Sequence, residues 1–345
     1  MTESVNVPNA LAKRAIRNIP KKTLKLYLES IGVNPIYELL DDPDYVLTFL
    51  TPAQARWITD NFLTNTPKVP IYMFELKSAP FNEFSELPEE ILSRANNIRR
   101  LKKYPKEPTL QLVYLNNSYK ELVLRFVFKS PKVEEIINEE TGKLMKYSRP
   151  IRVFVIFRAN NPLVDVRGSR INATLVKKVL FKALHLLSLN DTPKRVYMNN
   201  IGFIKSLLDF ASSVDYITLE FPGELLEEEE EPVPGKMAFS GRYGSKRTQA
   251  KDLRRYDTVM KAIDRAYKSG EITRAHLELT LPDKTIFDDI ASFGINFRES
   301  KLYPFRAYSE KAINEMLKIL YNVWKGGPYE DIPKRKQKWI DEFIS

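Results

Sequence analysis

Residues 109–128 read TLQLVYLNNSYKELVLRFVF, and this stretch decides the fold class. It contains two runs, 109–115 and 122–128, that are rich in β-branched and aromatic residues, as β-strands are. The polar triplet Asn116-Asn117-Ser118 separates the two runs, and a short polar connection of this kind joins antiparallel neighbours. The stretch therefore predicts a β-hairpin.

This hairpin is expected to belong to a larger antiparallel sheet. Two more runs with the composition of strands follow it, at 151–158 and 163–166. Residues 173–188 then repeat apolar residues at helical spacing. Four antiparallel strands with a helix across one face predict a curved α/β layer. Further elements of this layer are expected at 71–77 (strand), 86–100 (helix), 201–211 (helix) and 216–221 (strand).

The N-terminal part, residues 9–65, predicts a small bundle of four or five helices. A first helix over 10–18 stops before Ile19-Pro20, and a second begins near Lys21 and ends at Gly32, since glycine commonly follows a helix C-terminus. Shorter helices are expected where a polar or turn residue precedes a proline, at Asn34-Pro35, Asp42-Pro43 and Thr51-Pro52.

The C-terminal part begins after an acidic segment. Residues 224–236 contain five consecutive glutamates from Glu227 to Glu231 and should form a linker, because such a run repels itself and builds no core. We expect a basic segment and a smaller α/β unit after it, with helices at 253–268, 284–293 and 310–324 and a strand at 274–281. The predicted fold class is α+β: an N-terminal helical bundle (1–66), a curved antiparallel-sheet α/β domain (67–223), the linker, and the C-terminal unit (237–345).

The composition excludes several kinds of chemistry. The chain has no cysteine and two histidines, so it can form neither disulfides nor thiolate metal sites, and His185 and His276 lack partners at metal-ligand spacing. Glycine-rich phosphate loops and a nucleophile elbow are also absent from the sequence. We therefore expect a non-enzymatic protein with no cofactor and no metal. Apolar runs far shorter than ~20 residues and an N-terminus without a signal pattern predict an intracellular protein, cytoplasmic or in the nucleus or nucleoid, with no membrane partner.

The charge balance points to a polyanionic partner. Lys and Arg number 54 against 44 Asp and Glu, which gives a net charge of +10. We expect DNA as the partner, because each phosphate contacted by Lys or Arg releases counterions and adds affinity. Arg167 and Arg170 are the strongest candidates, since they precede a helix N-terminus, where backbone N–H groups favour phosphate. The full predicted set is Lys13, Arg14, Arg17, Lys21, Lys22, Arg167, Arg170, Lys178, Lys194, Arg195, Lys246, Arg247, Arg254 and Arg255.

Two alternatives remain open at the level of sequence. Asp44, which follows Pro43, and the later Glu75 and Lys77 have the order of a PD-(D/E)xK nuclease, in which two carboxylates hold a divalent metal and the lysine organises the attacking water. Glu75 and Lys77 are expected on one face of a strand. The other alternative is a basic subunit of a protein assembly, whose surface meets an acidic protein.

Several stretches resemble the kinetochore family of centromere protein N. Residues 12–20, AKRAIRNIP, with the leucines after them, look like the first helices of that family. The strand at 151–158, the Asn-Pro turn, the basic stretch 167–170 and the helix at 173–188 follow a similar succession. Residues 274–295, a strand and then a helix that ends in Gly294-Ile295, resemble its C-terminal unit.

The resemblance implies both a fold and a partner. The fold would be a helical, death-fold-like N-terminal domain followed by a basic α/β domain related to the TATA-binding protein. The partner would be chromatin, with Lys13 and Arg14 on histone or DNA. The phosphate contacts that it implies come from Arg167, Arg170, Lys194 and Arg195.

Overall fold

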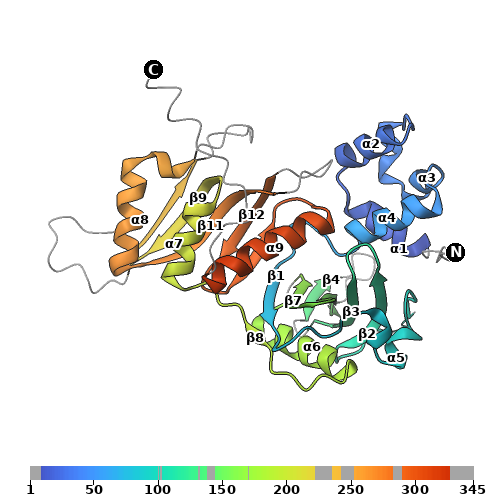
Figure 1. Cartoon of the computed structure of the whole chain (residues 1–345). Helices are drawn as coiled ribbons and strands as arrows, with labels where there is room; N and C mark the ends of the chain where they lie inside the picture. The colour runs from blue at the N-terminus through green and yellow to red at the C-terminus, as the bar shows by residue number, and fades with distance from the viewer. Residues whose placement is uncertain are drawn as a thin grey trace. The chain divides into compact units, whose positions relative to one another are not determined.

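The computed structural model describes residues 9–99, 101, 103–130, 133–137, 144–169, 171–221, 235–241, 252–282 and 290–326. The chain forms two compact units, which we call the first unit (Met1–Val196 with Ser300–Glu310) and the second unit (Tyr197–Glu299 with Lys311–Ser345). Both contain helices and antiparallel strands, and the N-terminal region is helical (Figure 1). The predicted α+β class is confirmed.

The first unit begins with the helical bundle. Local sequence signals set its helix ends: Asp42 accepts the N–H of Asp44 at 2.9 Å, and Thr51 and Gln54 form a capping box. Gly32, at φ 82°, follows the second helix as predicted. The helices are α1 (Asn9–Asn18), α2 (Lys21–Ser30), η1 (Tyr37–Asp41), α3 (Pro43–Leu47) and α4 (Pro52–Phe62). Their shared core is Ala15, Ile16, Ile19, Leu24, Leu28, Leu40, Val46, Ile58 and Phe62.

The sheet of the first unit contains the predicted hairpin at one side. Its strands run in the order β13-β1-β7-β6-β3-β2, and β8 also pairs with β1. The strands are β1 (Ile71–Glu75), β2 (Thr109–Asn116), β3 (Glu121–Lys129), β6 (Pro150–Arg158), β7 (Asn161–Gly168), β8 (Lys194–Arg195) and β13 (Lys301–Pro304). The helices after β1 and β7 are η2 (Phe84–Glu86), α5 (Glu89–Leu92) and α6 (Ala173–Leu186).

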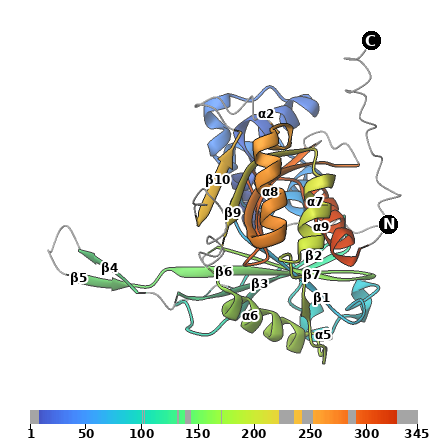
Figure 2. The same cartoon turned by 90° about the vertical axis from the view of Figure 1, so that its left-hand side faces the viewer.

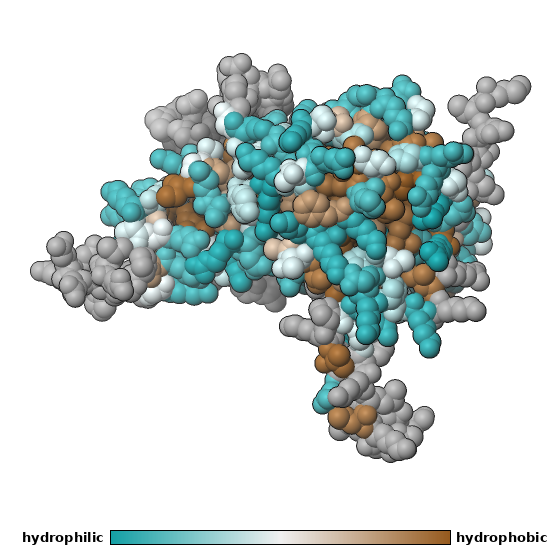
Figure 3. All heavy atoms as spheres, turned by 90° about the horizontal axis from the view of Figure 1, so that it is seen from below, coloured by the Kyte–Doolittle hydropathy of each residue, from teal (hydrophilic) through white to brown (hydrophobic). Residues whose placement is uncertain are grey.

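Between β3 and β6 the chain forms a two-stranded arm. The arm consists of β4 (Glu134–Ile137) and β5 (Leu144–Tyr147), which pair with each other and project from the sheet (Figure 2). Hydrophobic residues are visible on it in the space-filling view (Figure 3). Val133 and Leu144 are exposed. Residues 138–143, between β4 and β5, lie outside the described residues.

The two faces of this sheet have different partners because side chains alternate along each strand. One face packs against α6 and α5, where Val179, Leu180 and Ile91 meet Phe126 and Val155. The other face packs against the bundle. Its apolar contacts join Leu11 of α1 and Leu63 with Leu112, Tyr114, Val123, Phe154 and Ile156.

Polar contacts also fix the bundle to this second face. The hydroxyl of Tyr114 donates to the carboxylate of Asp60 in α4, and Ser118 donates to the same carboxylate at 2.5 Å. Asn116 donates to the backbone oxygen of Asp60 at 2.9 Å. Helix α4 is thus held on the β2–β3 hairpin, and α1 packs against α4.

The second unit is built on its own antiparallel sheet. Its strands run in the order β10-β9-β11-β12. They are β9 (Ser213–Glu220), β10 (Lys236–Ser240), β11 (Glu271–Thr280) and β12 (Ile290–Asn296). The helices are α7 (Ile201–Phe210), η5 (Leu253–Arg255), α8 (Asp257–Ser269) and α9 (Glu310–Lys325), which starts at the last residue of the first unit.

Several expected elements differ from the observed ones. The helix predicted over 86–100 is limited to η2 and α5, because Ala95 and Ile98 instead bridge to β2. The helix predicted over 284–293 is wrong in its last residues, which belong to β12. Helix α7 and strand β9 belong to the second unit rather than to the central layer, and the bundle and the first sheet form one unit. Most of the predicted linker, residues 224–234, lies outside the described residues.

Candidate nucleic-acid interface

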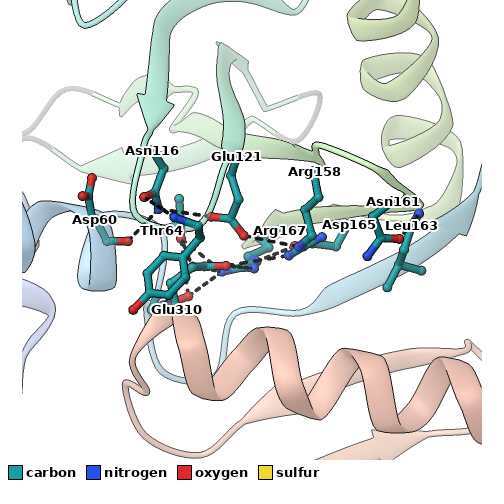
Figure 4. Close-up of polar contacts among 12 residues, drawn as sticks. Asp60, Thr64, Asn116, Glu121, Arg158, Asn161, Leu163, Asp165, Arg167 and Glu310 are labelled. Atoms are coloured by element: carbon teal, nitrogen blue, oxygen red, sulfur yellow. Dashed lines mark hydrogen bonds and ion pairs between the residues drawn. The ribbon is translucent and has the colours of Figure 1, made fainter. Parts of the chain in front are cut away.

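The strongest predicted phosphate ligand, Arg167, is a buried structural residue. It is 1% exposed, and its guanidinium donates to both carboxylate oxygens of Glu310, at 2.8 and 2.6 Å (Figure 4). It also donates to Asp165 at 2.5 Å and to Thr64 at 3.0 Å. The prediction that Arg167 holds a phosphate is therefore wrong, because all of this charge is already paired inside the fold. Arg170 lies outside the described residues.

A second arginine completes this buried ionic network. Arg158 pairs with Asp165 at 2.5 Å, with Glu121 at 3.2 Å and more distantly with Glu310. Burial alone would lower the pKa of Arg167, but Asp165 and Glu310 raise it. Burial likewise would raise the pKa of Asp165, but the two arginines lower it. The network therefore consists of charges that stabilise one another.

Three predicted lysines form ion pairs on the surface of the first unit. Lys13 pairs with Asp44, Lys21 with Asp41 at 2.5 Å, and Lys178 with Glu107 at 2.5 Å. Exposed pairs of this kind contribute about 0–1 kcal/mol. These lysines can therefore leave the carboxylate and bind a phosphate at little cost in free energy. Their predicted role as phosphate contacts stays a prediction.

The predicted residues of β8 and of the second unit have mixed environments. Lys194 and Arg195 form β8, and the Arg195 guanidinium lies 5.3 Å from the ring centroid of Tyr72. Arg254 is held by Asp252 and donates to the backbone oxygen of residue 208 at 2.7 Å. Arg254 therefore has a structural role. Lys246 and Arg247 lie outside the described residues.

Besides Lys178 and Lys194, three predicted cations are exposed. They are Arg17 on α1, Lys22 on α2 and Arg255 in η5. Within the described ranges, none of them forms an ion pair. Arg17 is the one that lies on the helix packed against the sheet.

The structure also reveals a cluster that the sequence reasoning found only in part. Arg125 of β3 and Arg152 of β6 lie on the face of the sheet that packs against α1, and Arg14 of α1 reaches the same place. The Arg14 guanidinium lies 5.1 Å from the ring centroid of Phe154. We call Arg14, Arg125 and Arg152 the arginine cluster.

The electrostatics of the arginine cluster are opposite to those of the ionic network. Burial, followed by repulsion from Arg14 and Arg152, lowers the pKa of Arg125 to about 9. Burial and then Arg152 lower the pKa of Arg14 to about 10. The buried Nε atoms of Arg14 and Arg125 have no hydrogen-bond partner, and no carboxylate pairs with the cluster in the described part of the chain. These charges repel one another, which favours an anion between them.

The sequence contained one signal for this cluster. Arg125 interrupts the apolar run 122–128, where a strand buried on both faces has no place for an unpaired charge. Arg152 gave no signal, because an arginine at the start of a strand is ordinary. Only the register Val127↔Arg152 and Arg125↔Phe154 brings the two together.

The residues of the nuclease alternative are not arranged as predicted. Strand β1 ends at Glu75, so Lys77 does not share its face; the backbone N–H of Lys77 instead donates to Asp191 at 2.8 Å. Asp44 lies on α3 and pairs with Lys13. Among the described residues, no three or more His, Asp or Glu side chains come together in a group that could hold a metal ion.

Comparisons with known proteins add no family assignment. No protein-family model matches the chain, and no curated protein matches it either. The resemblance to the centromere protein N family stays a prediction. Among the described residues, no helix is long and apolar enough to cross a membrane.

Proposed function

We propose that this protein binds DNA without catalysis, through the phosphates of the backbone and with the side of the first unit where α1 meets β3 and β6. The observation that carries the proposal is the arginine cluster, in which Arg14, Arg125 and Arg152 converge and pair with no carboxylate of the described residues. The planar guanidinium of arginine can donate two parallel hydrogen bonds to phosphate oxygens. Contacts with phosphates give affinity without reading the base sequence.

The surroundings of the cluster fit an extended polyanion. Arg17 is exposed one turn further along α1, and the projecting arm leaves the sheet at Lys129↔Pro150, next to the Val127↔Arg152 pair. Lys13 on α1 has only an exposed ion pair to give up. A DNA backbone that crosses the boundary between α1 and the sheet, which we call the seam, would therefore meet several cations in succession. Binding through several phosphates requires such an arrangement.

The polyanionic partner could be chromatin rather than bare DNA, or an acidic protein in place of DNA. The resemblance to the centromere protein N family suggests chromatin as the DNA-containing partner. An acidic protein surface is the alternative partner, in which case the chain is a basic subunit of an assembly.

The test is the binding of a fluorescently labelled duplex, followed by anisotropy over a salt series. We expect the affinity to fall steeply with salt, because counterion release drives phosphate binding. No binding at low salt would refute the DNA proposal and favour an acidic protein partner. The duplex should stay intact with Mg²⁺ or Mn²⁺, and cleavage that disappears in Glu75→Ala would overturn the non-catalytic part. Stronger binding to nucleosomes than to the bare duplex would support the chromatin part.

A further inference from the structure

Arg125 is a buried cation that pairs with no carboxylate in the described part of the chain. Its side chain sits in the middle of β3 and is 5% exposed, and its Nε has no hydrogen-bond partner among the described residues. A buried charge is strongly unfavourable unless it is paired and hydrogen-bonded. Arg125 therefore costs stability as long as the site contains protein atoms only.

The same sheet provides an internal comparison. Phe154 is opposite Arg125 in the register of β3 and opposite Arg167 in the register of β7, so the three side chains form one row on one face. At one end of the row Arg167 meets the carboxylates of Asp165 and Glu310. At the other end Arg125 meets two further arginines. The fold neutralises Arg167, whereas among the described residues Arg125 meets the like charges of Arg14 and Arg152, opposed only by the weaker influence of the Tyr104 phenol.

An anion would reverse this imbalance. Arg14 and Arg152 belong to different elements, α1 and β6, and both act electrostatically on Arg125. Arg152 is exposed and Arg14 is half-buried, so the cluster is accessible from solvent on one side. A phosphate group suits three planar guanidinium forks that come from different directions, because its anionic oxygens lie on a tetrahedral centre and can each accept more than one hydrogen bond.

We propose that Arg14, Arg125 and Arg152 form a pocket for one phosphate group, with the ring of Phe154 beside it. The proposal deepens the proposed function and rests on it for the source of the group, a phosphodiester of the DNA backbone. A free phosphorylated small molecule has the same chemistry and is the other source. Because Arg14 comes from α1 and the other two from the sheet, the bound phosphate ties the bundle to the sheet. Binding at this pocket therefore stabilises the first unit.

The test compares stability and binding in Arg125→Met, which keeps an unbranched side chain as far as the position of the arginine Nε and removes the charged guanidinium. Without ligand, Arg125→Met should melt a few degrees above the wild type, because an apolar side chain replaces an uncompensated buried charge. Inorganic phosphate and pyrophosphate should raise the melting temperature of the wild type beyond sodium chloride of equal ionic strength. This extra rise should be lost in Arg125→Met, and its affinity for duplex DNA should be at least tenfold lower.

Two matched variants separate a pocket from a general effect. Arg94→Met removes an exposed arginine that pairs with Glu90 within α5 and the turn after it, and it should retain the full response to phosphate and DNA. Arg125→Lys keeps the charge but loses the fork, so it should fold like the wild type and bind both ligands more weakly. It keeps the proposal testable if Arg125→Met fails to fold.

The outcomes distinguish this proposal from the proposed function. If Arg125→Met and Arg125→Lys bind phosphate and DNA as the wild type does, the pocket is refuted while DNA binding stands. If phosphate stabilises the protein through Arg125 but no duplex binds, the pocket stands with a small phosphorylated ligand and the DNA function fails. If only the duplex responds to Arg125, the pocket takes a backbone phosphate. A loss of stability in Arg125→Met, with unchanged binding, would make Arg125 structural and overturn the proposal.

Discussion

Arg125 and Arg167 flank Phe154 in one row of the first sheet, and both are buried. Asp165 and Glu310 neutralise Arg167, whereas Arg125 has Arg14 and Arg152 as its charged neighbours. Burial is common to both residues, so the difference lies in what the fold brings beside each one. Arg167 therefore holds distant parts of the chain together, and Arg125 is the residue for which we propose a ligand.

Glu310→Gln should destabilise the protein strongly. The carboxylate of Glu310 accepts two hydrogen bonds from Arg167, and removing one partner of a buried pair costs roughly 3–5 kcal/mol because it leaves a charge uncompensated. Urea unfolding followed by circular dichroism measures the change. Glu90→Gln, which breaks the exposed pair with Arg94, is the matched control and should cost less than ~1 kcal/mol. Similar losses in both variants would contradict a structural network.

Tyr114→Phe should weaken the attachment of the bundle to the sheet. Its hydroxyl donates to the buried carboxylate of Asp60. Burial raises the pKa of Asp60, which means that the charged carboxylate depends on its hydrogen-bond donors. Removing the Tyr114 hydroxyl therefore leaves the carboxylate of Asp60 poorly compensated. We expect a loss of about 1–3 kcal/mol in the free energy of unfolding. Tyr37→Phe removes an exposed hydroxyl and should change stability by less than about 0.5 kcal/mol. Equal effects would mean that Tyr114 contributes through its ring alone.

Sequence reasoning succeeded where local rules decide the structure. The helix starts at Asp42 and Thr51, the end at Gly32, the β2–β3 hairpin and α6 all follow from capping, turn and periodicity signals within a few residues. Sequence reasoning failed where residues far apart in the chain determine the environment of a side chain. The charge of Arg167 is cancelled by a residue 143 positions away, so a basic residue before a helix looked free when it was not.

The candidate site was predictable only in part for the same reason. Arg14 was expected to bind, but the two arginines beside it come from strands whose register sets their proximity. Strand β12 was missed because its run, IASFGIN, has an apolar pattern that also suits a helix end; its pairing with β11 decides the outcome.

Asp252→Asn should reduce stability in a pH-dependent way. Burial acts to raise the pKa of Asp252, but Arg254 and the backbone N–H groups of Arg254 and Val214 lower it. Because the folded pKa lies below the unfolded value, this carboxylate stabilises the protein at neutral pH, and the contribution is lost as the pH falls below about 4. The variant should lose about 1–2 kcal/mol at pH 7. The difference from the wild type should shrink in acid.

Urea unfolding at pH 7 and near pH 3 measures this dependence. Asp209→Asn, at an exposed position near the end of α7, should change stability by less than about 0.5 kcal/mol at both values. If the loss in Asp252→Asn were as large in acid as at neutral pH, the effect would come from packing rather than from charge.

The location of the DNA interface can be tested with two variants that remove equal charge. Arg17→Ala with Arg152→Ala removes two exposed cations from α1 and β6, and Lys261→Ala with Lys268→Ala removes two from α8 of the second unit. The first pair should weaken binding to duplex DNA at least tenfold at one ionic strength, because it removes phosphate contacts. It should also reduce the slope of log affinity against log salt by about 1.8, since each phosphate contributes about 0.9. The α8 pair should weaken binding less than about threefold and leave the slope unchanged, because only a diffuse, screened attraction is lost. Equal losses in the two variants would mean that the protein binds through its net charge alone, and the seam between α1 and the sheet would no longer be the interface.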